Sequence, residues 1–335
     1  KSFTYRTLGD LKKAQQLIDE YLTKDKTDSS AWSLKGRIEY EMGNIDEGIK
    51  FTLISYDIDS NNSRTCNNLG LFFKRKKDLV NAEKYLLEAT ECDPNNIGAL
   101  TNLAILYEEK GDLLTAADLI IRAINLAPDK KTLHFNAGNI AAEISRNNYF
   151  DKAIKVLELL IKVDKDNMIN WFNLALNYQQ IQNYHEAIKC FKTVEKNLPD
   201  DEQTLIFLVK LNGKQGNFTE AILYCEKLLD KNISILNALC WKAQYMQANG
   251  KGKEAIEFMK AVISNNEMND SLWVTLASLY ATEGDYKKTV AMIIGARQKI
   301  ILNGEQNNTE KMRDLDEMQN EYQRLFDKKI NSTQN

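Results

Sequence analysis

The sequence has few of the residues from which covalent and metal-binding sites are built. Its 335 residues include only two histidines and five cysteines, and no two cysteines form a CxxC pair. A structural zinc site needs closely spaced Cys and His ligands, and a disulfide framework needs an even set of cysteines. We therefore predict no metal site, and interpret most of the cysteines as small buried apolar side chains, which suits a reducing compartment. They are Cys66, Cys92, Cys190, Cys225 and Cys240.

The sequence also lacks an excess of one charge and any long apolar run. The formal net charge is −3 and the pI is near 5.7, so no positive field attracts phosphate and we predict no nucleic-acid ligand. No run approaches the roughly 18 apolar residues of a membrane helix, and no signal peptide opens the sequence. We expect a cytoplasmic protein with no membrane insertion, although a targeting segment could precede Lys1, which already lies in a helical pattern.

Enzyme motifs are missing as well. The sequence has no glycine-rich phosphate loop, no HExxH and no GxSxG. His134 falls at an aromatic core position of a predicted helix and His185 falls in a predicted turn, so packing explains the former better than catalysis does. We predict a protein that is not an enzyme, with no catalytic, cofactor-binding or metal residues and no cofactor.

What the sequence does contain is a repeat. A small residue returns in phase along almost the whole chain, in steps of 34 residues with a single step of 37. A period of this length indicates stacked helical hairpins, in which a small side chain lets two helices cross closely. The series is Ala14, Gly48, Ala82, Ala116, Ala153, Ala187, Ala221, Ala255 and Thr289.

Two further columns share this phase and divide each repeat into two helices. Six glycines stand five residues before the small residue, where a tight turn favours a positive φ. They are Gly9, Gly43, Gly111, Gly216, Gly250 and Gly284. Pro94, Pro128 and Pro199 each follow the small residue by twelve positions and end the second helix. Between these marks apolar residues recur at three and four, which predicts an all-α fold without strands.

The predicted first helices carry large and small residues in a fixed order. The clearest examples are Trp32 with Gly36, Leu69 and Gly70 with Phe73, Leu103 and Ala104 with Tyr107, Trp171 to Ala175 with Tyr178, and Trp273 with Leu276, Ala277 and Tyr280. This pattern resembles the tetratricopeptide repeat (TPR). The resemblance implies a right-handed α-α superhelix, a solenoid of stacked antiparallel helical hairpins, whose usual function is to hold other proteins.

The phase also assigns the domain boundaries. We expect a partial repeat at 1–28 and eight full repeats at 29–62, 63–96, 97–130, 131–167, 168–201, 202–235, 236–269 and 270–303. A capping helix at 304–330 then covers the apolar face of the last repeat, and 331–335 form a disordered tail. The alternative for this helix is a coiled-coil partner, but it holds fewer than three heptads.

The single 37-residue step places three extra residues around Ser145, Arg146, Asn147 and Asn148. We interpret them as a longer turn in the fourth repeat, because insertions in solenoids map to loops. The alternative is a partner contact on the outer rim.

The first helices of this family line a concave groove, so the phase predicts which residues face a ligand. Four successive repeats have an asparagine at one position: Asn68, Asn102, Asn136 and Asn173. Because an amide both donates and accepts, such a ladder can hold the main chain of an extended peptide. It resembles the ladder of O-GlcNAc transferases, although asparagine at this site is common in the family generally.

Apolar and charged side chains complete the predicted groove. The apolar and amide positions are Leu71, Ile105, Phe135, Asn139, Phe172, Leu176 and Ile206, and the charged positions are Arg64, Lys74, Glu108 and Glu143. An exposed apolar strip suits an amphipathic helix or an extended apolar segment of a partner, while partial burial against the next repeat is equally compatible.

The clamp by which some members of the family bind chaperone C-terminal carboxylates requires a lysine that this sequence lacks. Its site is occupied by Ser33, Asn67, Thr101, Phe135, Phe172, Ile206, Cys240 and Val274. We predict a non-catalytic scaffold or adaptor that binds a peptide or helix of a partner protein, and not a chaperone cofactor. The alternatives are a structural subunit of a large assembly and the substrate-recruiting region of a larger enzyme.

Overall fold

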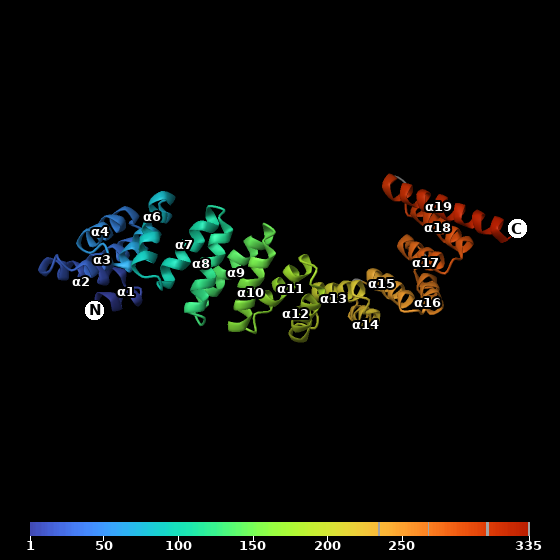
Figure 1. Ribbon diagram of the computed structural model, residues 1–335, viewed down its shortest axis with the longest axis horizontal. Coiled ribbons are helices and arrows are strands. Elements are labelled where there is room, and N and C mark those ends of the chain that lie inside the picture. Colours follow the sequence, from blue (N-terminus) through green and yellow to red (C-terminus); the bar gives the residue numbers. More distant parts are fainter. Residues whose placement is uncertain (234, 267, 306–307, 334–335) are drawn as a thin grey trace. The chain divides into compact units, whose positions relative to one another are not determined.

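The computed structural model describes residues 1–233, 235–266, 268–305 and 308–333, and every regular element in them is a helix (Figure 1). The predicted all-α fold is confirmed. The first helices of the hairpins are α1 Ser2–Thr7, α3 Ser29–Glu41, α5 Ser63–Arg75, α7 Ile97–Glu109, α9 Lys131–Arg146, α11 Met168–Gln180, α13 Glu202–Lys214, α15 Ile235–Ala248 and α17 Asp270–Thr282. The second helices are α2 Leu11–Lys24, α4 Ile45–Ile58, α6 Leu79–Cys92, α8 Leu113–Leu126, α10 Phe150–Val163, α12 Tyr184–Asn197, α14 Phe218–Asp230, α16 Gly252–Asn265 and α18 Tyr286–Leu302, and α19 Thr309–Thr333 follows them.

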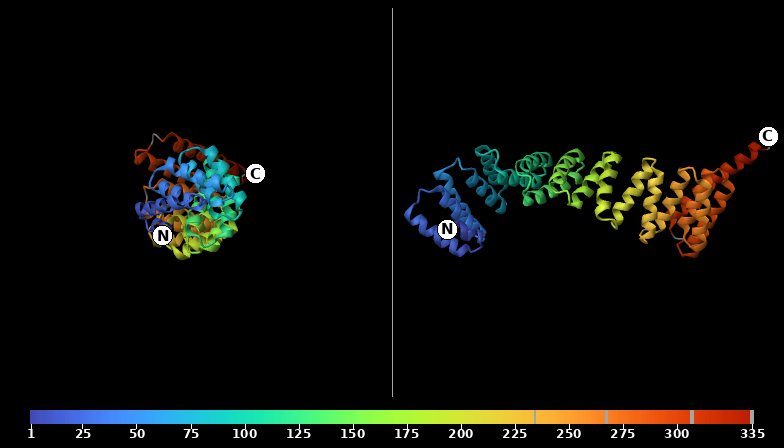
Figure 2. Two further views of the ribbon diagram at one scale, coloured as in Figure 1. Left: turned by 90° about the vertical axis from the view of Figure 1, so that its left-hand side faces the viewer. Right: turned by 90° about the horizontal axis from the view of Figure 1, so that it is seen from below.

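The helices form two compact units, Lys1–Asn183 and Tyr184–Asn335, which we describe separately. In the first unit the two helices of each hairpin pack together, and the hairpins follow one another in chain order (Figures 1 and 2). The first helices also touch directly, α3 with α5, α5 with α7, α7 with α9 and α9 with α11. They therefore make one continuous face of this unit.

Side chains of Asp and Asn fix where many of the helices begin. The Asp28 carboxylate accepts a hydrogen bond from the Ala31 backbone N–H at the start of α3, and Asn62 and Asn96 cap α5 and α7 in the same way. Asp78 and Asp112 do so for the second helices α6 and α8. A cap of this type satisfies a backbone donor that the helix leaves unpaired, and typically contributes about 1 kcal/mol.

The turn inside each hairpin has the backbone conformation that the glycine column predicts. The six glycines of that column have φ between 74° and 94°. Three hairpins without a glycine place Lys77, Asn148 or Gln182 there, with φ between 60° and 66°. The backbone conformation of the turn is thus the same in these hairpins while the residue varies. Residues other than glycine adopt this left-handed conformation at a cost in conformational free energy.

The small-residue column brings the two helices of a hairpin into close contact. Ala82, Ala116 and Ala153 are completely buried. At Gly36 on α3, an added Cβ would overlap the Thr52 side chain and lie 2.7 Å from the carbonyl oxygen of Gly48 on α4. Only a residue without a side chain allows this crossing.

The fourth hairpin differs from the prediction of a longer turn. Helix α9 has 16 residues where α7 and α11 have 13. Its turn is no longer than the turn that follows α7, because α9 ends at Arg146 and α10 begins at Phe150. Three residues are close to one helical turn of 3.6, so the helix absorbs the insertion. The Ser145 hydroxyl of this added turn bonds the Asn177 side chain on α11 at 2.9 Å.

In the second unit, α19 packs on the last hairpin. Leu315 is buried in a cluster with Ala277, Ile293, Ala296 and Ile300. Residues 331–333 continue this helix, which corrects the predicted disordered tail; the Ser332 hydroxyl bonds the Lys329 carbonyl oxygen within it. Gln334 and Asn335 lie outside the described residues.

Candidate protein-interaction groove

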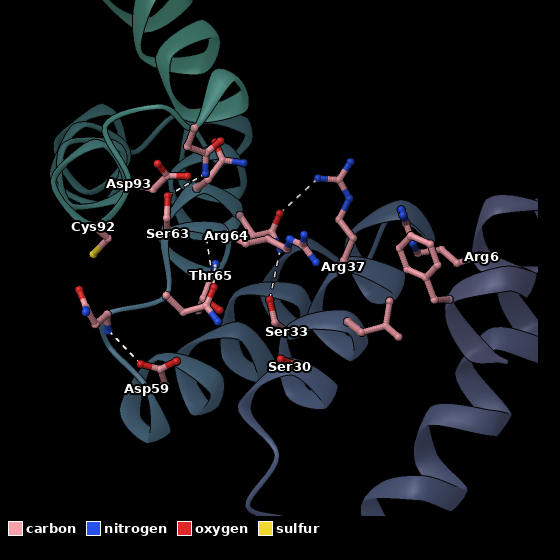
Figure 3. Close-up of a pocket in the computed structure, with 17 residues that line it drawn as sticks. Arg6, Ser30, Ser33, Arg37, Asp59, Ser63, Arg64, Thr65, Cys92 and Asp93 are labelled. Atoms are coloured by element: carbon pink, nitrogen blue, oxygen red, sulfur yellow. Dashed lines mark hydrogen bonds between the residues drawn. The ribbon is translucent and has the colours of Figure 1, made fainter. Parts of the chain in front are cut away.

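A cavity of about 980 Å³ opens on the first-helix face of the first unit, among α1, α3, α5 and the loops that precede α5 and α7 (Figure 3). Three arginines from three successive first helices line it: Arg6, Arg37 and Arg64. The amides of Asn67 and Asn68 lie on its α5 wall. We call this cavity the arginine groove.

Two of the arginines share one carboxylate. The Glu41 side chain accepts hydrogen bonds from Arg6 Nη1 at 2.6 Å and from Arg37 Nε at 2.8 Å. The Arg6 guanidinium also lies 5.2 Å from the Phe3 ring centroid, in a cation–π contact. Because one carboxylate balances two guanidinium groups, this pair keeps a net positive charge and a fixed geometry.

The third arginine is free of such a partner. Arg64 stands on the first turn of α5, exposed, and makes no ion pair among the residues that the structure describes. In Figure 3 its side chain extends toward Arg37. It therefore presents its guanidinium donors to the groove.

The predicted asparagine ladder begins with two amides that bond inside the protein. Asn68 is 7% exposed; its Nδ2 donates to Ser33 Oγ at 3.3 Å and its Oδ1 accepts from Arg37 Nη1 at 3.5 Å. The Asn102 amide donates to Asn67 Oδ1 at 2.9 Å. These bonds tie neighbouring first helices together.

The remaining predicted amides differ in exposure. Asn136 and Asn173 are partly buried, and Asn139 on α9 is exposed. Asn67, which the ladder prediction did not include, lines the groove and keeps an amide donor on that wall. The sequence does hold a signal for Asn67, because it is the fifth residue of its repeat, the same position as the predicted groove residues Phe135 and Phe172.

The predicted apolar strip contains one side chain that is mainly exposed. Phe135 on α9 is 71% exposed. The other apolar members are partly buried: Leu71, Ile105, Phe172, Leu176 and Ile206, the last of which lies on α13 of the second unit. Sequence reasoning missed Ile169 on α11, which is 72% exposed and occupies the repeat position of Arg64.

Two of the four predicted charged residues, Lys74 and Glu143, form ion pairs, and both partners lie outside the predicted set. Lys74 bonds Glu109 at 2.8 Å, which joins α5 to α7, and Glu143 pairs with Arg146. Burial raises the pKa of Glu108, and the charges of Glu143 and Glu109 raise it further. Lys74 and Arg146 therefore balance part of the acidic charge on α7 and α9, whereas Arg64 makes no ion pair among the described residues.

These features define a class: a helical-repeat scaffold whose stacked hairpins present one continuous face. Family models described as tetratricopeptide repeat match residues 63–96, 85–117 and 170–197. With the consecutive packing of helix pairs, they identify the chain as a tetratricopeptide repeat protein. Its general role is that of a protein-interaction scaffold.

Several solved structures are similar to this chain. The TPR protein YrrB, described as having an unusual peptide-binding site, has 14% identity and a TM-score of 0.45 over 56% of this chain and 95% of its own. MamA has 20% identity and a TM-score of 0.42 over 50% and 91%. The C-terminal part of a TPR protein from Cytophaga hutchinsonii has 12% identity and a TM-score of 0.49 over 68% and 93%. A comparison with curated proteins gives no significant match.

The described residues contain neither of two other kinds of site. None of the helices in the described ranges has the length and hydropathy of a membrane span. Among the described residues no three His, Cys, Asp or Glu side chains are grouped as metal ligands.

Proposed function

We propose that the protein is a non-catalytic adaptor that binds a segment of a partner protein along the first-helix face of its first unit. The observation that carries this proposal is Phe135, a large aromatic side chain that is 71% exposed on a face otherwise built of packed helices. Exposed aromatic side chains of this size are typical anchors of protein interfaces.

The residue expected beside Phe135 supports the same proposal. Gly98, the second residue of α7, lies beside Asn67, the fifth residue of α5: an added Cβ at Gly98 would lie 3.6 Å from the Asn67 amide nitrogen. The same two positions of successive first helices should therefore be neighbours in other repeats. By this relation we expect Ile169 beside Phe135, because α9 and α11 are in contact. The two side chains would form an apolar patch that an extended segment or a helix can cover.

The test is capture of a partner by variants of this patch. We expect Phe135→Ala with Phe172→Ala to abolish capture of the partner that the wild-type chain isolates from its native source. Helical circular dichroism should stay the same, because Phe135 contributes little to the core. The matched control is Tyr149→Ala, which removes a 45% exposed aromatic side chain from a turn outside this face.

The readout is the amount of the identified partner that each purified variant retains. Unchanged retention by a folded double variant would place the binding surface elsewhere and end the proposal. Loss of retention in the Tyr149→Ala control as well would also count against it, because the effect would then not be specific to the groove.

A further inference from the structure

We infer that the groove selects an extended partner segment with an acidic side chain at the arginine groove and an apolar side chain about six residues away at Phe135. This inference rests on the proposed function and specifies the chemistry of its ligand. The two anchors stand on helices α5 and α9 of the same unit.

The helices of the arginine groove offer more hydrogen-bond donors than the protein itself uses. Two of the three guanidinium groups, those of Arg6 and Arg37, already donate to the Glu41 carboxylate, and Arg37 also donates to the Asn68 amide oxygen. Arg64 is exposed and has no ion pair among the described residues. A ligand with acceptor oxygens and negative charge complements such a surface.

Two aspartates also line the groove and limit what the ligand can be. Asp59 and Asp93 lie in the loops before α5 and α7, and each accepts a backbone N–H of its own loop, from Asn61 at 3.2 Å and from Asn95 at 3.0 Å. Their charge disfavours a phosphate dianion more strongly than a single carboxylate. We therefore assign the arginines to Asp or Glu side chains of a peptide.

Contacts between first helices connect the arginine groove to Phe135. Helices α5, α7 and α9 contact one another in order, so the two anchors stand on the same first-helix face. The axes of packed helices lie about 8–10 Å apart, so the distance from α5 across α7 to α9 is roughly 20 Å. An extended peptide rises about 3.3 Å per residue, which gives a spacing of about six residues.

The experiment measures binding of synthetic 12-residue peptides by fluorescence anisotropy to the chain of residues 1–335. The first peptide carries a Glu-Asp pair and a Leu six residues away in a Ser/Thr/Gly background, made in both orders. The second replaces the pair with Gln-Asn, the third shortens the spacing to two residues, and the fourth replaces the pair with phosphoserine.

We expect the better order of the first peptide to bind at least about tenfold more tightly than the second, because the neutral amides lose the charge-assisted hydrogen bonds to the arginines. The third peptide should also bind more weakly, because its Leu cannot reach Phe135 while its acidic pair lies at Arg64. Arg64→Gln should remove the advantage over the second peptide, and Arg64→Lys should retain part of it. The matched control is Arg75→Gln on the same helix, an exposed arginine that does not line the groove and should change nothing.

Equal binding of the acidic and neutral peptides, or no effect of Arg64→Gln, overturns the inference. Tighter binding of the phosphoserine peptide overturns it in favour of a phosphorylated partner. If capture of the native partner depends on Phe135 but not on Arg64, the proposed function stands and the acidic anchor fails. If it depends on neither, both fail.

Discussion

Gly36 and Gly138 are each the eighth residue of their helix, α3 and α9, but they differ in packing. Gly36 lies where an added methyl group would strike Thr52 and the α4 backbone, whereas an added Cβ at Gly138 on α9 meets nothing within 4 Å. We expect Gly36→Ala to lower the free energy of unfolding by about 1–3 kcal/mol through overpacking. Gly138→Ala should raise it by about 0.5–1 kcal/mol, because alanine loses less backbone entropy in a helix.

Urea denaturation followed by circular dichroism checks both substitutions, each acting as the control of the other. A loss of stability in Gly138→Ala would show that this part of α9 is packed more tightly than the structure indicates.

Single residues also show which side-chain contacts could not be predicted from the sequence. The phase placed Asn68 on a first helix at a position that faces the groove in this family, but it could not reveal that the amide is buried and bonds Ser33 and Arg37. Those partners depend on which side chains stand on the neighbouring helix. Arg64 was predicted as a groove residue, but Arg6 and Arg37 were missed for the same reason, because the three arginines stand at unequal repeat positions and line one cavity only in three dimensions.

At the scale of the element, α19 is expected to stabilise the last hairpin. Leu315 is 4% exposed against α17 and α18, and the Lys311 ammonium bonds the Asp270 carboxylate at 2.7 Å. Leu315→Ala should cost about 2–4 kcal/mol, since it leaves a cavity between packed helices. Asn320→Ala, an exposed position of the same helix, should be neutral.

Thermal unfolding of both variants tests this role of α19. Equal melting temperatures for Leu315→Ala and the wild-type chain would mean that α19 does not hold the last hairpin.

Helix lengths were harder to predict than helix positions. The 37-residue step indicated three extra residues, and turns are where solenoids usually accept insertions. In α9 those residues instead keep the backbone hydrogen bonding of a helix, and Asn148 takes the left-handed turn that glycine takes elsewhere. A sequence count cannot decide between these outcomes, because both preserve the phase of the next helix.

At the scale of the whole molecule, the repeat makes stability a local property. The helix pairs that pack extensively are neighbours or next neighbours in chain order. The 34-residue steps run through residues 183 and 184 without a break, so the division into two units at that point had no signal in the repeat itself. In such an array each hairpin is stabilised mainly by the hairpins beside it.

A substitution where two helices cross should therefore destabilise only the neighbouring helices. Ala82→Leu overpacks the contact of α6 with α5 and is expected to lower amide hydrogen-exchange protection in α5, α6 and α7. Protection of α16, α17 and α18 should stay at the wild-type level, and Ala255→Leu should give the reverse pattern. Hydrogen-exchange mass spectrometry resolves the two regions, and a uniform loss in both variants would show that the chain unfolds as one cooperative body instead of as a series of neighbours.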